Sequence, residues 1–395
     1  MIKIEDKRAC CGCGAYAEVC PVHAIAMHVD AEGFRYPLVD ATTCISCGLC
    51  VKQCPFLTPQ PKREDATEAL LMYDAHAYYR QEASSGGAFS LLARRIIAEG
   101  GVVVGAAFDE RWGVQHIAIE DADELWRLKG SKYVESALGD VYSRVKGWLK
   151  AGRRVMFTGT PCQVAGLKRA LGKDYPQLLS VDIACHGVPS SMVWDRALTE
   201  WCAEEQLTRE DIKRINFRSK VGGWKYYHFA IDHTRGDYAT RTFPYTLGFA
   251  HDLYLRPSCH ACRVKEVNSY ADITLADAWG VEQVTHDTRF LDDKGVSLLL
   301  VRTPRGAEAV AAIDDAVSEK VSAAIMLQHN KYITQSVPYT AERAKFFVFL
   351  SQGLSVKESI GKAHRVSLIK RLEVWLTPLL NRLGIKGFTK RWRRK

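Results

Sequence analysis

The chain has 395 residues, a formal net charge of +9 and a hydrophobic content of 47%. This length predicts two or three domains, and the hydrophobic content is that of an ordinary globular protein. Residues 361–395 hold eleven Lys or Arg and one acidic residue, which is +10 of the total, so the other 360 residues have a net charge of −1. A body without net positive charge argues against nucleic acid as a partner.

The 13 cysteines indicate metal binding rather than disulfide bonds. Disulfide-dense chains are usually short and secreted, whereas this chain starts with "MIKIEDKRAC", which lacks the apolar segment of a signal peptide. No stretch approaches the run of about 18 apolar residues that a membrane-spanning helix needs. We therefore expect a cytoplasmic protein in a reducing compartment, where thiolates hold metal.

Residues 44–55, "CISCGLCVKQCP", carry a complete iron–sulfur motif. The bacterial ferredoxin pattern is C-x2-C-x2-C-x3-C-P. Every position is filled, by Cys44, Cys47, Cys50, Cys54 and Pro55. The motif predicts a 4Fe–4S cluster within a bacterial-ferredoxin-like module of residues 1–58.

Residues 9–21, "ACCGCGAYAEVCP", carry the same pattern with one ligand missing. Tyr16 stands at the third cysteine position and Cys11 is a spare thiol. In paired motifs the fourth cysteine ligates the other cluster. The second cluster then has the complete ligand set Cys20, Cys44, Cys47 and Cys50. The first has only Cys10, Cys13 and Cys54.

The state of this first cluster is open on the sequence. Cys11 or another ligand would complete a 4Fe–4S cluster, loss of one iron would give a 3Fe–4S cluster, or the cluster is absent. A phenol oxygen is a poor match for such a sulfur-rich site.

The rest of the chain alternates between helix and strand. Residues 59–68 predict a linker. Helices are expected at 86–100 and 162–172, and strands at 101–109, 153–161, 178–185 and 271–280. The predicted fold class is α+β in the module and α/β in the body. Its domains are 69–150, 151–325 and a helical, basic tail of 326–395.

Four cysteines of the body form a candidate third metal site. Cys162 and Cys185 each follow a predicted strand, and Cys259 and Cys262 form a C-x2-C pair. Strand ends converge at one edge of a sheet, so these thiols are expected to meet. Zinc and iron–sulfur are both open on spacing alone, as is a structural role for buried thiols. Cys202 lies in a helical pattern and is expected to be a structural, partly buried thiol.

Three glycine-containing turns are candidate phosphate sites. "SSGGA" and "TGTP" each precede a helix, whose first N–H groups face outward, and "LKGSK" adds two lysines. Each segment taken alone is better explained as an ordinary turn, but three such segments in one chain are consistent with a diphosphate-bearing cofactor such as FAD. There is no G-x-G-x-x-G fingerprint of a Rossmann NAD site. The candidate cofactor residues are Ser85, Gly86, Gly87, Lys129, Ser131, Lys132, Thr158, Gly159, Thr160 and Gln163.

Three further features carry alternatives. His186 is a candidate proton donor, since imidazole titrates near neutrality, or else a structural histidine. Residues 216–229, "NFRSKVGGWKYYHF", predict either a site for an anionic, aromatic ligand or a surface hairpin. Apolar residues at helical spacing in the basic tail predict contact with an anionic membrane surface, at the inner face of the membrane, or docking on a partner or on the body.

These segments resemble the beta subunits of coenzyme F420 hydrogenases and dehydrogenases, which form one family. The resemblance rests on "SSGGAFSLLA", "KGSKYVES", "FTGTPCQVAGLKR", "DIACHGVPSS", "FRSKVGGW" and "RPSCHAC…ADITLADAWG". It implies FAD and an adjacent 4Fe–4S cluster whose ligands here are Cys162, Cys185, Cys259 and Cys262.

The resemblance leaves the substrate open. Family members act on a deazaflavin or on chlorophyll-type rings, and many bacterial relatives lie beside genes for cell-surface polysaccharide biosynthesis. Two functions are therefore expected. One is a flavin- and iron–sulfur-dependent oxidoreductase that exchanges electrons with a redox partner, with Lys132 and His186 as candidate catalytic residues. The other is a non-catalytic electron-transfer or scaffold subunit.

Overall fold

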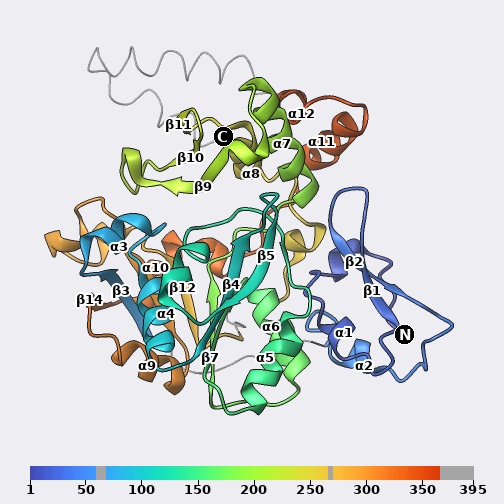
Figure 1. Cartoon of the computed structure of the whole chain (residues 1–395), viewed down its shortest axis with the longest axis horizontal. Helices are drawn as coiled ribbons and strands as arrows, with labels where there is room; N and C mark the ends of the chain where they lie inside the picture. Colours follow the sequence, from blue (N-terminus) through green and yellow to red (C-terminus); the bar gives the residue numbers. More distant parts are fainter. Residues whose placement is uncertain (59–67, 266–269, 365–395) are drawn as a thin grey trace.

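The computed structural model describes residues 1–58, 68–265 and 270–364 (Figure 1). Three layers are visible: a small N-terminal module, a large mixed sheet with its helices, and a helical layer with a small sheet. Within these ranges no helix is long and apolar enough to cross a membrane. The part of the tail predicted to bind membranes, beyond His364, lies outside the described residues.

The N-terminal module contains an internal repeat around its cysteines. Its elements are η1 (Lys7–Ala9), α1 (Ala15–Glu18), β1 (Ile25–Val29), β2 (Arg35–Val39) and α2 (Leu49–Lys52). β1 and β2 pair antiparallel. Gly14 precedes α1 with φ 71° and Gly48 precedes α2 with φ 76°. This left-handed conformation favours glycine, so both cysteine loops turn into their helices in the same way.

The central sheet has nine strands in the described part of the chain, in the order β14-β3-β13-β12-β8-β7-β4-β5-β6. Its four middle strands, β12, β8, β7 and β4, run parallel. The outer ladders β12–β13, β13–β3, β3–β14 and β4–β5 are antiparallel. The strands are β3 (Glu68–Asp74), β4 (Val102–Phe108), β5 (Val114–Ile119), β6 (Ser136–Ala137), β7 (Val155–Gly159), β8 (Leu178–Ile183), β12 (Ile273–Asp277), β13 (Ser297–Val301) and β14 (Ala316–Val321).

Helices cover both faces of this sheet, because successive side chains of a strand point to opposite faces. Val104 and Phe157 pack with α5 (Val141–Lys150) and α6 (Pro161–Leu171) on the face that also meets the module. Val103 and Met156 pack against α4 (Ala88–Ala98) and α9 (Pro304–Ala311) on the other face. Further elements beside the sheet are α3 (Ala77–Glu82), η2 (Ala122–Arg127), η6 (Val281–Gln283), η7 (Thr288–Phe290), α10 (Ala323–His329) and η8 (Lys331–Ile333).

The third layer packs around Trp194 and Phe217, whose rings lie 5.1 Å apart. Its sheet has the order β11-β10-β9. Residues 216–229 thus span an antiparallel strand pair, as the hairpin alternative predicted, but Arg218, Lys220 and Trp224 are buried, so these three side chains do not lie at the surface. The elements are α7 (Ser191–Glu204), η3 (Arg209–Asp211), β9 (Ile212–Ser219), η4 (Lys220–Gly222), β10 (His228–His233), β11 (Gly236–Thr240), α8 (Pro244–Ala250), η5 (Pro257–Ala261), α11 (Ala341–Ser351) and α12 (Val356–Ala363).

The predicted fold class is confirmed, and the six elements predicted from sequence are present as α4, α6, β4, β7, β8 and β12. The predicted division at residue 150 falls within one sheet, because β4 pairs with β7. Cys202 is buried in α7, in keeping with a structural thiol.

Candidate cofactor cavity and iron–sulfur sites

A cavity of about 300 Å³ opens at the carboxyl ends of the parallel strands. Its walls include Ala106 of β4, Thr158 of β7, Ile183 of β8 and Ala276 of β12. Crevices at the carboxyl ends of parallel strands are the usual ligand sites of α/β sheets. Nine of the ten candidate cofactor residues line it: Ser85, Gly87, Lys129, Ser131, Lys132, Thr158, Gly159, Thr160 and Gln163.

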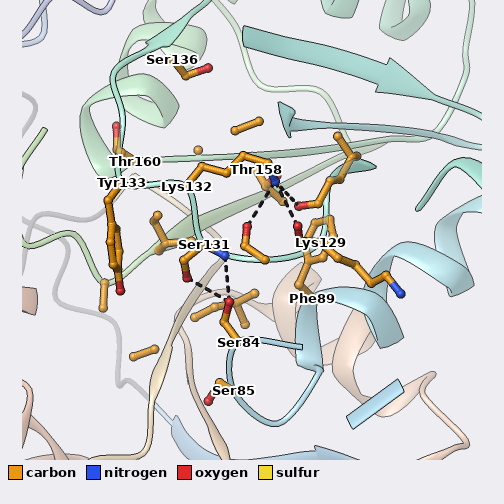
Figure 2. A pocket seen from close by; sticks show the side chains of 18 of the residues that line it. Ser84, Ser85, Phe89, Lys129, Ser131, Lys132, Tyr133, Ser136, Thr158 and Thr160 are labelled. Carbon is orange, nitrogen blue, oxygen red and sulfur yellow. Dashed lines mark hydrogen bonds between the residues drawn. The ribbon is translucent and has the colours of Figure 1, made fainter. Parts of the chain in front are cut away.

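Two of the glycine-containing turns meet across this cavity (Figure 2). The backbone N–H of Ser131 donates to the hydroxyl oxygen of Ser84 at 2.8 Å, and the two hydroxyls lie 3.1 Å apart. Gly87 has φ 100° and is the N-cap of α4, which has no side-chain cap. The first N–H groups of α4 therefore lack a side-chain acceptor, and Ala88 and Phe89 at this end line the cavity. Such a helix end is suited to an anion.

Lys132 lies within the cavity wall, where its amine is held by backbone oxygens. Its Nζ donates to the carbonyl oxygens of Leu128, Lys129 and Gly130 at 3.3, 3.0 and 3.2 Å. Burial lowers the pKa of Lys132 to about 7. Three carbonyl partners hold the amine in place, and an anionic ligand would favour its charged form.

In the third glycine-containing turn, "TGTP", side chains already bond to the first backbone N–H groups of the helix that follows. Thr160 and Gln163 form a capping box at the start of α6, and Thr160 N donates to Gln163 Oε1 at 2.9 Å. The Thr158 hydroxyl donates to the Val104 carbonyl at 2.9 Å. These side chains shape the wall and are already hydrogen-bonded. Ala88 and its neighbours at the α4 terminus therefore offer the freer anion site.

Two candidate residues lie outside the cavity lining. Gly86 N donates to Ser297 Oγ at 3.0 Å, and any side chain there would overlap the Met72 carbonyl oxygen. Gly86 thus permits the loop to pack on β3 and β13. The His186 ring pairs with Asp252, with Nε2 2.5 Å from Oδ1. A catalytic role for His186 stays a prediction.

Sequence reasoning missed one cavity residue, His116, whereas another, Arg218, lies in residues 216–229, which were predicted as a possible site for an anionic, aromatic ligand. His116 contacts Ser136 Oγ at 2.7 Å and the Thr158 carbonyl at 3.0 Å, and burial lowers its pKa to about 4. Arg218 is buried, forms an ion pair with Asp277, and lines the cavity with it. The "FRSK" motif contains Arg218, but no local pattern marks His116, which β5 brings beside β7 through the shared sheet.

The four candidate ligands of the third metal site line one hollow. Cys162, Cys185, Cys259 and Cys262 come together there from the ends of β7 and β8 and from η5. Cys162 also lines the cavity described above, as do Cys11 and Val188, so cavity and hollow share a wall.

Four thiols around one hollow are the ligand set of either a zinc ion or a 4Fe–4S cluster. The family resemblance implies the cluster, and this assignment stays a prediction.

Two buried cations border this hollow, Arg256 and Lys265. Burial raises the pKa of Cys259 to about 12, and the charge of Lys265 acts in the opposite direction. Because ligation requires thiolates, a nearby cation assists it. Lys265 Nζ donates to the His186 carbonyl at 2.8 Å, which fixes its place. The sequence signal for Lys265 is only its position three residues after Cys262.

The candidate ligands of the second cluster also share a hollow. It is lined by Cys20 of the first cysteine run together with Cys44, Cys47 and Cys50 of the second. The structure thus brings together the set expected from the shared-ligand rule. Cys47 is exposed, which places this site at the surface of the module.

The third ligand position of the first cysteine run is occupied by an aromatic ring. Tyr16 is 1% exposed, and its hydroxyl lies 3.1 Å from Cys10 Sγ. Burial is the main cause that raises the pKa of Cys54, and the nearby Cys10 raises it further. The nearby Cys13 thiol is the main cause that raises the pKa of Cys11. Cys11 also lines the cavity and the third hollow, so it lies between the first and third sites.

Together, the sheet, the cavity and the cysteine sets define an iron–sulfur redox protein. The 4Fe–4S dicluster domain profile matches residues 9–57. The profiles for the N-terminal and C-terminal parts of the coenzyme F420 hydrogenase/dehydrogenase beta subunit match residues 72–141 and 152–324. The chain belongs to this family of beta subunits, as the motifs predicted.

Two relatives are redox proteins whose names include coenzyme F420. The coenzyme F420-dependent sulfite reductase of Methanocaldococcus jannaschii is 22% identical over 219 residues, 54% of this chain and 33% of that protein. A subunit of the F(420)H(2) dehydrogenase of Methanosarcina mazei is 24% identical over 177 residues, 41% of this chain and 49% of that protein. The chain thus spans less than half the length of either relative.

A similar solved structure is a chain of the F420-reducing NiFe hydrogenase complex from Methanosarcina barkeri. It has 16% sequence identity and a TM-score of 0.46, and the match covers 69% of this chain and 92% of that chain.

Proposed function

We propose that the protein is an iron–sulfur flavoprotein oxidoreductase, with FAD in the cavity and clusters that exchange electrons with a partner protein. The observation that carries this proposal is the shared wall: Cys162 lines both the cavity and the hollow of the third thiol set. A cofactor in the cavity would lie next to a cluster in that hollow, because Cys11, Cys162 and Val188 line both.

The chain's own residues suit the diphosphate of FAD. The N-terminus of α4, behind Ser85 and Gly87, offers N–H groups without a side-chain cap. Lys129 and Lys132 stand opposite, on the loop held to Ser84 by the Ser131 hydrogen bonds. The positive helix end and the lysines together form an anion site. Apolar wall residues such as Leu128 and Leu275 suit a planar ring.

When bound, FAD supplies hydride chemistry and exchanges single electrons, which links a two-electron substrate to one-electron clusters. The protein's part is to hold Lys132 and Arg218 at the cavity and to exclude bulk water from it. The cysteine sets would carry electrons toward the module surface near Cys47, where a redox partner protein is proposed to bind.

The alternative is a non-catalytic electron-transfer or scaffold subunit. The preserved cavity beside the third thiol set favours the oxidoreductase, since a scaffold needs no such cavity. The visible spectrum of the anaerobically purified protein decides between them. Flavin bands together with cluster absorbance, and FAD released on denaturation, are expected. Cluster absorbance without any releasable flavin, even after incubation with FAD, contradicts the proposal.

The substrate class is a separate prediction. The resemblance to the beta-subunit family implies a deazaflavin or another organic substrate. It also suggests a role in cell-surface polysaccharide biosynthesis. Mixing the FAD-loaded protein with reduced coenzyme F420 tests the first: bleaching of the flavin bands is expected, and an unchanged spectrum excludes this deazaflavin as electron donor. A cytoplasmic location and membrane contact through the basic tail also stay predictions.

A further inference from the structure

The internal repeat of the module shows what Tyr16 replaces. Gly14 and Gly48 turn the two cysteine loops into α1 and α2 with nearly identical backbone angles. Tyr16 is the second residue of α1, and Cys50 is the second residue of α2. Cys50 lines the hollow of the second site. Tyr16 therefore stands where the complete site has a thiol ligand.

The Tyr16 side chain fills this position and does not leave it open to solvent. Its ring is 1% exposed and packs in the core with Cys10 and Cys54. Its hydroxyl lies 3.1 Å from Cys10 Sγ. A phenol oxygen is a hard ligand that matches a sulfur-rich site poorly.

Cys11 is poorly placed to substitute for the missing thiol. In the repeat it corresponds to Ile45, an apolar residue beside the second site. Cys11 lines both the cavity and the third hollow, as Cys162 does, whereas the Tyr16 hydroxyl lies beside Cys10 Sγ. A shift of Cys11 to the Tyr16 position would take its side chain away from that shared wall.

We infer that the first site holds a 3Fe–4S cluster ligated by Cys10, Cys13 and Cys54, with Tyr16 in the place of the fourth iron and its ligand. This inference rests on the proposed function, in which both cysteine runs hold clusters. Each iron of a 4Fe–4S cluster needs one ligand besides its three sulfides, and the iron at the Tyr16 position has no thiolate to supply it. Cluster type is one determinant of reduction potential, so the first site differs in potential from the second.

The test is electron paramagnetic resonance of anaerobically purified protein after mild oxidation. An oxidised 3Fe–4S cluster has three ferric ions and an odd number of unpaired electrons, so it gives a signal, whereas an oxidised ferredoxin-type 4Fe–4S cluster is silent. We expect a stoichiometric signal from the wild type. Tyr16→Cys, treated identically, should lose that signal and gain a cluster that becomes paramagnetic only on reduction. An equal signal in both proteins would mean that it comes from damage at another site and overturns the inference.

Two matched variants separate the ligands. Cys54→Ser should remove the signal of the oxidised protein, because Cys54 is a ligand. Cys11→Ser should keep it, because Cys11 is not. A wild type that is silent when oxidised, together with loss of a 4Fe–4S cluster in Cys11→Ser, would show Cys11 to be the fourth ligand and overturn the inference.

Failure of the proposed function gives a different result. A chain with iron in the second and third sites only would show no change in iron content in Cys54→Ser, and would have no first cluster. A chain without releasable FAD but with the oxidised signal would contradict the flavin proposal and leave the 3Fe–4S site intact.

Discussion

Arg256 and Glu135 form a buried ion pair, in which Nη1 lies 2.9 Å from Oε1. The guanidinium is 1% exposed, and its Nε donates to the Cys10 carbonyl at 2.9 Å. Glu135 lines the cavity. This pair therefore joins the first cysteine loop to the cavity wall. Gly12 is required beside it, since a Cβ there would lie 2.6 Å from the guanidinium.

Arg256→Gln should destabilise the protein strongly, because it leaves the buried Glu135 without its main partner. Removing one member of a buried ion pair costs about 3–5 kcal/mol. The free energy of unfolding, measured by denaturant titration of the cluster-loaded protein, checks this. Arg289→Gln is the control, since the Arg289–Asp287 pair is largely exposed and should be without measurable effect. Equal destabilisation by both variants would contradict a special role of the buried pair.

Gly87→Val should abolish FAD binding while iron content stays unchanged. Gly87 has φ 100°, and its Cβ would lie 3.1 Å from Asp74 Cβ. A β-branched residue in this conformation would distort the turn before α4. FAD released per chain on denaturation is the measurement. Gly147→Val is the control, because Gly147 in α5 has open space around its Cβ position. Retention of stoichiometric FAD by Gly87→Val would exclude this turn from the site.

Cys162→Ser and Cys185→Ser should each lower the iron content by one cluster's worth. Both thiols line the third hollow, and cluster ligation contributes to folding, so lower thermal stability is also expected. Cys202→Ser is the matched control, because Cys202 is a buried thiol of α7 that lies in none of the three cysteine sets. Iron content equal to that of the control in both variants would show that these are structural thiols.

FAD affinity should fall as pH rises above neutrality. Burial lowers the pKa of Lys132 from 10.5 to about 7, so the amine is charged below that pH and largely neutral above it. The charged form favours the anionic diphosphate, and bound anion raises the pKa of Lys132. Affinity is thus highest below pH 7 and falls by up to about tenfold per pH unit above it, the limit for one linked proton.

Binding of FAD to the apo-flavin protein, followed by fluorescence quenching at several pH values, measures this dependence. Lys132→Met should weaken binding below pH 7 and flatten the pH profile. Lys129→Met should weaken binding and keep the slope, since Lys132 is intact. A slope that persists in Lys132→Met would assign the proton to another group.

The elements and the ligand sets could be predicted from local sequence patterns. Four cysteines and a proline at fixed spacing in residues 44–55 define a cluster motif without any tertiary information, because the first three cysteines ligate one cluster from a single short loop. Runs such as "GVVVGAAFD" define buried strands because a parallel strand is covered on both faces. The departure at Tyr16 was equally visible from the spacing.

Contacts between distant groups exist only in the folded chain. Arg256 and Cys10 are 246 positions apart in sequence and are in contact only because the module docks on the sheet. His116 reaches the cavity through the pairing of β5 with β4, and the place of Cys11 beside Cys162 depends on packing of the module against α6. Local patterns carry no information on such contacts, because burial and docking depend on the whole chain. For the same reason the sequence left the first cluster open, and the inferred 3Fe–4S cluster rests on the burial of Tyr16 beside Cys10, which only the folded chain shows.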